Sequence, residues 1–145
     1  MAASEKRSGL PVTLLLGAAI GAPLLVAPAV IRGLAAFAWV SHYASVESLP
    51  RPRRAAARAV AARVETAIMN LAPLPQASAA AIRALEIGQR VEQQEHDPEA
   101  ALLIYQGVQN ACARVRSRPL SGAGFAVIEA RATTLQNAVR SSAPK

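Results

Sequence analysis

Residues 81–111 read AIRALEIGQRVEQQEHDPEAALLIYQGVQNA and predict two helices separated by a tight turn. Asp97 is the expected N-cap of the second helix, because its short acidic side chain can accept free amide protons of the first turn. Pro98 suits the first helical position, and Glu99 places a negative charge at the positive end of the helix dipole. Apolar side chains then recur every three or four positions, as one helix face requires: Ala101, Ile104, Tyr105, Val108, Cys112 and Val115.

Two further helices extend this pair into a bundle. Ser78 is the expected cap of a first helix that runs to about Glu95. After a loop at residues 118–124, a third helix carries apolar residues spaced 3, 4, 3 and 4: Phe125, Ile128, Ala132, Leu135 and Val139. No alternating run of β-branched residues competes with these helices. The sequence therefore predicts an all-α chain in which residues 76–141 form an antiparallel three-helix bundle, followed by a short tail at 142–145.

Residues 44–75 are predicted to be a basic linker that contains an amphipathic helix. Two prolines in 46–53 indicate the linker, whereas 54–71 contain neither Gly nor Pro and are rich in alanine, the best helix former. A basic helix close to a membrane can lie on anionic lipid, and four arginines are the candidate membrane-surface residues: Arg51, Arg53, Arg54 and Arg58. A solvated helical spacer is the alternative interpretation.

Residues 9–31 form an uncharged run of 23 residues, and about 20 apolar residues suffice for a helix that crosses a bilayer. We assign residues 9–43 to a membrane segment that ends in the interfacial aromatics Trp39 and Tyr43, and residues 1–8 to an N-terminal tail. Two alternatives stay open. A re-entrant hairpin would explain Arg32 and the helix-disturbing prolines at 11, 23 and 28. A cleaved or targeting segment would explain the basic start and the small residues at 27–29.

The net charge of +7 is unevenly distributed along the chain. Residues 1–64 carry eight basic and two acidic side chains, whereas residues 65–145 carry eight and seven. The heavier cationic flank of a membrane segment normally stays in the cytosol, so we expect a single-pass or hairpin protein with a cytosolic C-terminal bundle. The nearly neutral C-terminal half argues against a nucleic-acid partner, because phosphate binding needs a concentrated cationic face.

The sequence contains no recognisable catalytic arrangement. His42 and His96 lie in separate segments, and Cys112 falls on an apolar stripe, where it is interpreted as a core residue. One cysteine cannot build a thiolate metal cage, and the GAG at 122–124 lacks the lysine and preceding strand of a phosphate-binding loop. The acidic residues of 92–99 are interpreted as caps and a solvated patch. We predict a non-enzymatic protein with no cofactor, no metal and no small-molecule substrate.

The helical hairpin at 81–111 resembles the MIT (microtubule-interacting and trafficking) domain family. Ala81-Ile82, Gly88, Glu92 and Asp97 match the first helix and turn of that family, and the second helix matches at Glu99, Ala101, Leu102, Tyr105 and Val108. In the third helix the matches are Ile128, Ala130, Arg131 and Leu135, whereas Asn137-Ala138-Val139 stands where the family often has Arg-Ala-Glu. The second helix is also similar to a tetratricopeptide hairpin, but no 34-residue second copy follows.

The resemblance implies a module that binds short tail motifs of ESCRT-III or other trafficking partners. Such a tail would lie as a helix between the second and third helices or as an extended segment between the first and third. By residue, Glu129 would pair with an arginine of the tail, while Ala132 and Leu135 would form the floor. The function predicted from the sequence is thus a membrane-anchored adaptor. The alternative is a small single-span accessory subunit of a larger membrane complex.

Overall fold

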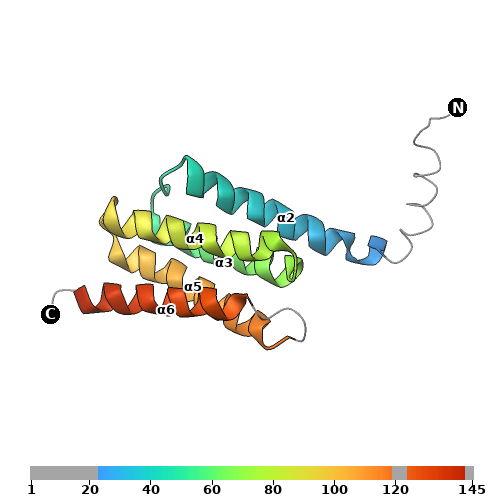
Figure 1. Ribbon diagram of the computed structural model, residues 1–145. Helices are drawn as coiled ribbons and strands as arrows, with labels where there is room; N and C mark the ends of the chain where they lie inside the picture. Colours follow the sequence, from blue (N-terminus) through green and yellow to red (C-terminus); the bar gives the residue numbers. More distant parts are fainter. Residues whose placement is uncertain (1–22, 119–123, 143–145) are drawn as a thin grey trace, which may run out of the picture. The chain divides into compact units, whose positions relative to one another are not determined.

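The computed structural model describes residues 23–118 and 124–142, and in these ranges the chain is helical without any strand. The chain divides into two compact units, residues 1–31 and 32–145. Helix α2 (Pro23–Ser45) begins in the first unit and ends in the second. The second unit also contains α3 (Arg53–Leu71), α4 (Pro75–Gln93), α5 (Pro98–Arg116) and α6 (Phe125–Ser142), which follow one another as an up-and-down bundle (Figure 1). The predicted all-helical fold class is confirmed.

Helix α5 begins where the sequence predicts. The Asp97 carboxylate accepts the Ala100 amide proton at 3.1 Å, Pro98 occupies the first helical position, and Glu99 lies in the first turn. The predicted apolar stripe is buried along the whole helix. Helix α5 packs against α3, α4 and α6, whereas α4 and α6 touch each other only sparsely. It is therefore the central element of the bundle.

Helix α3 is also part of the core. The sequence placed 54–71 in a separate linker segment, but α3 packs closely against both α5 and α4. Its apolar face, which includes Val60, Val64 and Ile68, is fully buried. The α3–α5 crossing is close, because a Cβ built on Gly107 would lie 2.5 Å from the Cβ of Ala61. The bundle thus extends beyond residues 76–141 on its N-terminal side.

Helix α4 begins three residues before the predicted cap. Leu74 is its N-cap and Pro75 its first residue, so Ser78 lies inside the helix. The Ser78 hydroxyl donates to the carbonyl of Pro75 at 3.2 Å instead of capping the first turn. Further along α4, Gly88 faces the ring of Tyr105, which is fully buried. The absence of a side chain at Gly88 lets α4 and α5 approach each other.

Residues 32–45 of α2 belong to the second unit and pack on the bundle. Ala36 and Val40 are buried, and Gly33 lies against the Leu71 side chain of α3. In the part of the chain that the structure describes, no helix combines the length and the apolar character needed to cross a membrane. Most of the uncharged run at 9–31 lies outside that part. The membrane segment at 9–43 therefore stays a prediction.

Candidate functional site

The three residues that the sequence assigned to partner binding do not share one surface. Glu129 lies on the flank of α6 that faces α5, where its carboxylate accepts from Arg116 Nε at 2.6 Å. Ala132 is fully buried beneath the helix. Leu135 is half-buried and comes one turn after Arg131, whose guanidinium donates to Gln89 of α4 at 3.3 Å. Side chains four apart share a helix face, so Leu135 lies on the opposite flank, toward α4.

The flank of α6 that carries Leu135 borders α4 along what we call the α4–α6 seam. On α6 it comprises Val127, Arg131 and Leu135, which are spaced four apart, and on α4 it comprises Ile82 and Gln89, which are seven apart. Val127 is 73% exposed and Ile82 is 40% exposed. Gln89 of α4 and Arg131 of α6 are hydrogen-bonded to each other. Ile82 precedes Gln89 in α4, Val127 precedes Arg131 in α6, and the two helices run in the same direction (Figure 1). The two apolar side chains therefore lie toward the same end of the seam.

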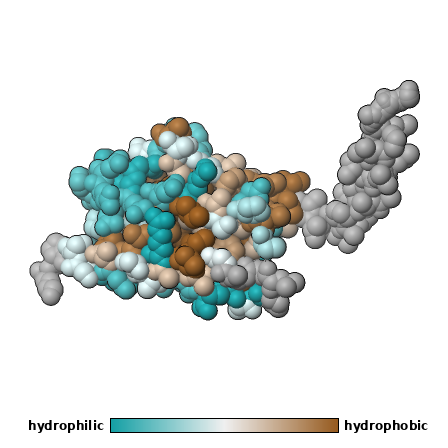
Figure 2. All heavy atoms as spheres, viewed as in Figure 1, coloured by the Kyte–Doolittle hydropathy of each residue, from teal (hydrophilic) through white to brown (hydrophobic). Residues whose placement is uncertain are grey.

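Hydrophobic side chains gather along the middle of the face on which α4, α5 and α6 run (Figure 2). Glu86, one turn after Ile82 on α4, is exposed and makes no ion pair with any residue that the structure describes. Elsewhere between α4 and α5, the Tyr105 hydroxyl donates to Glu92 at 3.1 Å. Burial and the nearby Glu92 carboxylate raise the pKa of Tyr105, so its hydroxyl stays protonated. The seam thus combines exposed apolar side chains with one available carboxylate.

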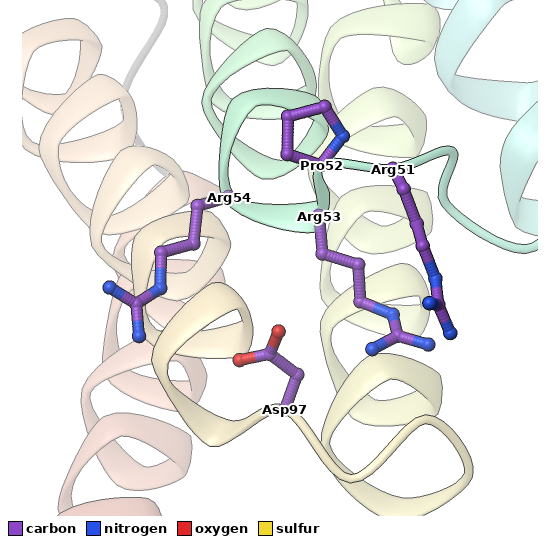
Figure 3. A pocket seen from close by; sticks show the side chains of 5 residues that line it. All are labelled: Arg51, Pro52, Arg53, Arg54 and Asp97. Atoms are coloured by element: carbon purple, nitrogen blue, oxygen red, sulfur yellow. The ribbon is translucent and has the colours of Figure 1, made fainter.

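The arginines assigned to the membrane surface fall into two groups. Arg53 Nε lies 2.9 Å from the Glu95 carboxylate, and Arg54 forms an ion pair with Glu99. Arg51 and Arg58 are exposed and pair with no carboxylate in the described part of the chain. Figure 3 shows the shallow hollow at this end of α3, where the Asp97 carboxylate lies between the side chains of Arg53 and Arg54, and Arg51 lies on the far side of Arg53. The lining of the hollow is Arg51, Pro52, Arg53, Arg54 and Asp97.

Two arginines at the start of α3, Arg53 and Arg54, are therefore neutralised by Glu95 and Glu99, which lie just before and just after the start of α5. Glu95 also pairs with Arg90 at 3.4 Å, and Arg90 donates to the Tyr43 carbonyl of α2 at 2.6 Å. The side chain of Glu95 is only 10% exposed. This network joins α2, α3 and α4. Sequence reasoning missed it, because Arg53 and Glu95 are 42 positions apart and no local spacing links them.

The remaining reactive groups are separated from one another. Burial raises the pKa of the Cys112 thiol to about 12, which keeps it protonated and unreactive. His96 is exposed in the turn before α5, and His42 lies 3.6 Å from Glu47. Among the described residues, no cluster of three histidine, cysteine or acidic side chains could hold a metal ion.

Comparison with protein-family models, with curated proteins and with solved structures finds no match for this chain. The resemblance to the MIT family thus stays a prediction based on the residues of 81–111 and of the third helix.

Proposed function

We propose that this chain is a membrane-anchored, non-enzymatic protein-interaction module that binds a short tail segment of a partner protein at the α4–α6 seam. The partner would be of the ESCRT-III or trafficking type that the MIT resemblance implies. In this proposal the tail lies along the first and third helices of the resembling unit, α4 and α6. The N-terminal run at 9–31 would hold the module at the membrane, with the bundle in the cytosol.

The exposed apolar pair at one end of the seam is the observation that carries this proposal. Val127 and Ile82 are the large hydrophobic side chains that α6 and α4 leave exposed within their described residues. Half-buried Leu135 continues the same flank of α6. Short segments bind such surfaces through a few apolar anchors, and charges at the border set their register.

The charged partner for an arginine of the tail is Glu86 in this proposal. Glu129 is already paired with Arg116 at 2.6 Å, on the other flank of α6. Glu86 is exposed and lies one turn after Ile82, on the same face of α4. A tail that presents an apolar residue and an arginine about one helical turn apart would therefore contact both.

The test is a fluorescence-anisotropy titration of the full chain against labelled C-terminal tail peptides of ESCRT-III subunits. We expect saturable binding with a Kd in the micromolar range, about −8 kcal/mol. Val127→Asp should weaken it at least about tenfold, because an apolar anchor is replaced by a charge that must be desolvated. Val46→Asp is the matched control, since Val46 is 66% exposed and lies in the loop after α2, away from the seam.

Two outcomes would refute this assignment. If Val127→Asp and Val46→Asp bind a tail peptide equally well, the seam is not the site. If the folded chain binds none of the peptides, the accessory-subunit alternative becomes the better proposal. Circular dichroism of each variant confirms that a loss of binding is not a loss of fold.

A further inference from the structure

We infer that a second surface, the outward face formed by α2 and α3, binds an anionic lipid bilayer. This basic α2–α3 face comprises three exposed arginines of the two helices, Arg32, Arg58 and Arg63, and the exposed Arg51 in the loop two residues before α3 begins, which also lines the hollow with Asp97. None of them makes an ion pair with a carboxylate in the described part of the chain. It lies on different helices from the α4–α6 seam, so this inference does not rest on the proposed tail binding.

Two carboxylates lie near this face, Glu47 and Glu65, and of these Glu65 is paired with an arginine. Glu47, in the loop between α2 and α3, lies 3.6 Å from His42. Glu65 of α3 forms an ion pair with Arg114 of α5. Elsewhere in the bundle, Arg90 pairs with Glu95 and Arg116 pairs with Glu129. The uncompensated positive charge of α2 and α3 is therefore concentrated on their outward side.

The arginines of the two helices border one another. The guanidinium of Arg63 lies over the ring of Trp39, 4.9 Å from its centroid, which fixes the contact between α3 and α2 at this point. Arg32 comes seven residues before Trp39 and shares its side of α2. Arg58 lies five residues before Arg63, and the small side chains around them, exposed Ala55 and Ala62 and half-buried Ala59, leave the helix surface unobstructed.

Aromatic and apolar side chains on the same helix distinguish a bilayer from a nucleic acid as the partner. Trp39 packs against Tyr43 with ring centroids 4.6 Å apart, and both rings are half-buried. Tryptophan and tyrosine are enriched at the headgroup level of membranes, where one edge of the ring is apolar and the other is wet. Ala35, four residues before Trp39, is also exposed, so the surface of α2 next to the Trp39 ring is apolar. A phosphate backbone offers no apolar layer for these side chains.

This surface refines the set of membrane-contacting residues that the sequence indicates. Arg51 and Arg58 stay in the set, while Arg53 and Arg54 leave it because they pair with Glu95 and Glu99. Each arginine near an anionic surface strengthens binding several-fold, and the effect decays within a Debye length of about 8–10 Å. Binding to this face should therefore be steeply dependent on both lipid charge and salt.

Trp39 provides a direct test, because it is the only tryptophan in the chain. The full chain is reconstituted into vesicles that contain acyl-brominated lipid, which quenches a tryptophan inserted at the interface. With about a third of phosphatidylserine in the vesicles, we expect Trp39 to be quenched more strongly at low salt than at high salt. In pure phosphatidylcholine vesicles the run at 9–31 still holds the chain at the lipid, but we expect weaker quenching that does not depend on salt, since the attraction to the arginines is lost.

The variant Arg51→Gln/Arg58→Gln removes two charges without touching the Trp39 environment. We expect it to lower the equilibrium constant for docking of the basic face on anionic vesicles about 30-fold, because each surface arginine typically contributes about 1 kcal/mol. The matched control Arg83→Gln/Arg140→Gln removes two charges from α4 and α6, and should change docking less than about twofold. Circular dichroism shows whether each variant is folded.

Three results would overturn the inference. Equal quenching of Trp39 in neutral and anionic vesicles would mean that the arginines do not hold this face on the lipid. Equal effects of the two double variants would mean that net charge matters and the location does not. A short DNA or RNA duplex that releases Trp39 from anionic vesicles, and that Arg51→Gln/Arg58→Gln binds less well, would assign the face to nucleic acid.

Discussion

Gly88 is the position at which the packing of α4 on α5 can be tested most sharply. A Cβ built on Gly88 would come within 3.0 Å of two ring atoms of Tyr105, a distance that real Cβ atoms essentially never show. The ring cannot easily move away, because it is fully buried and its hydroxyl is held by Glu92 at 3.1 Å. Gly88→Ala should therefore push α4 and α5 apart.

The sign of the effect follows from two opposing magnitudes. Alanine in a helix interior is more favourable than glycine by about 1 kcal/mol. Overpacking a well-filled core costs typically about 1–3 kcal/mol, and the close approach here involves a fixed aromatic ring, which favours the upper end. We expect Gly88→Ala to lower the free energy of unfolding by about 1–2 kcal/mol.

The measurement is urea unfolding of the full chain, followed by far-ultraviolet circular dichroism. Gly124→Ala is the control, because a Cβ at Gly124 has no neighbour within 4 Å, so its stability should be equal to that of the parent or slightly higher. Adding Tyr105→Leu to Gly88→Ala should cost less than the sum of the two single changes, since the collision is removed. If Gly88→Ala stabilises the chain by about 1 kcal/mol, as at a solvent-exposed helix position, the described α4–α5 packing is incorrect.

Three further predictions test the interior of the bundle. Glu95→Gln should destabilise the chain by about 3 kcal/mol, because it leaves two half-buried guanidinium groups without their carboxylate. Glu99→Gln should cost less than about 1 kcal/mol, because the Glu99 side chain is 63% exposed in its ion pair. The urea midpoints of the two variants give the comparison. The pKa of Cys112 is raised from 9.0 to about 12, so unfolding releases a proton between these values and stability should fall as pH rises above 9. Cys112→Ala removes this part of the loss in the same titration, whereas the part that comes from the raised pKa of Tyr105 remains at higher pH. Gln136→Ala should destabilise the chain by about 1–2 kcal/mol, because it removes the donor that reaches Gln109 at 2.5 Å in a buried interface; thermal unfolding measures the shift.

Local signals were sufficient to place α5 but not to place α3. For α5, the cap at Asp97, the proline after it and a continuous apolar stripe all lie within one segment, and the structure shows each of them. Helix α3 is rich in alanine, whose small side chain is compatible with either a buried or a solvated face. Its burial depends on partners distant in the chain, such as the close approach of Ala61 to Gly107 on α5, and a single sequence does not reveal these partners.

Charged segments were the hardest part of the sequence to interpret. The basic stretch around Arg53 and the acidic turn around Glu95 each have a plausible separate role, as a membrane-facing helix and as a solvated turn. Their pairing at 2.9 Å becomes visible only when α3 and α4 are packed together. Similarly, Glu129 and Leu135 are six positions apart on α6, yet the contacts of their neighbours place them on opposite flanks. Proximity in sequence does not ensure that two residues share a surface.

The two proposed surfaces impose different demands on the same bundle. The basic face lies on α2 and α3 and the α4–α6 seam lies on α4 and α6, and α3 packs against both α4 and α5. Arg58 and Trp39 are thus on different helices from Val127 and Ile82. Since neither surface uses a residue of the other, binding of lipid and binding of a tail need not compete. Docking on a membrane would instead hold the seam at a fixed height above the lipid, where a partner assembled on the same membrane presents its tail at high effective concentration.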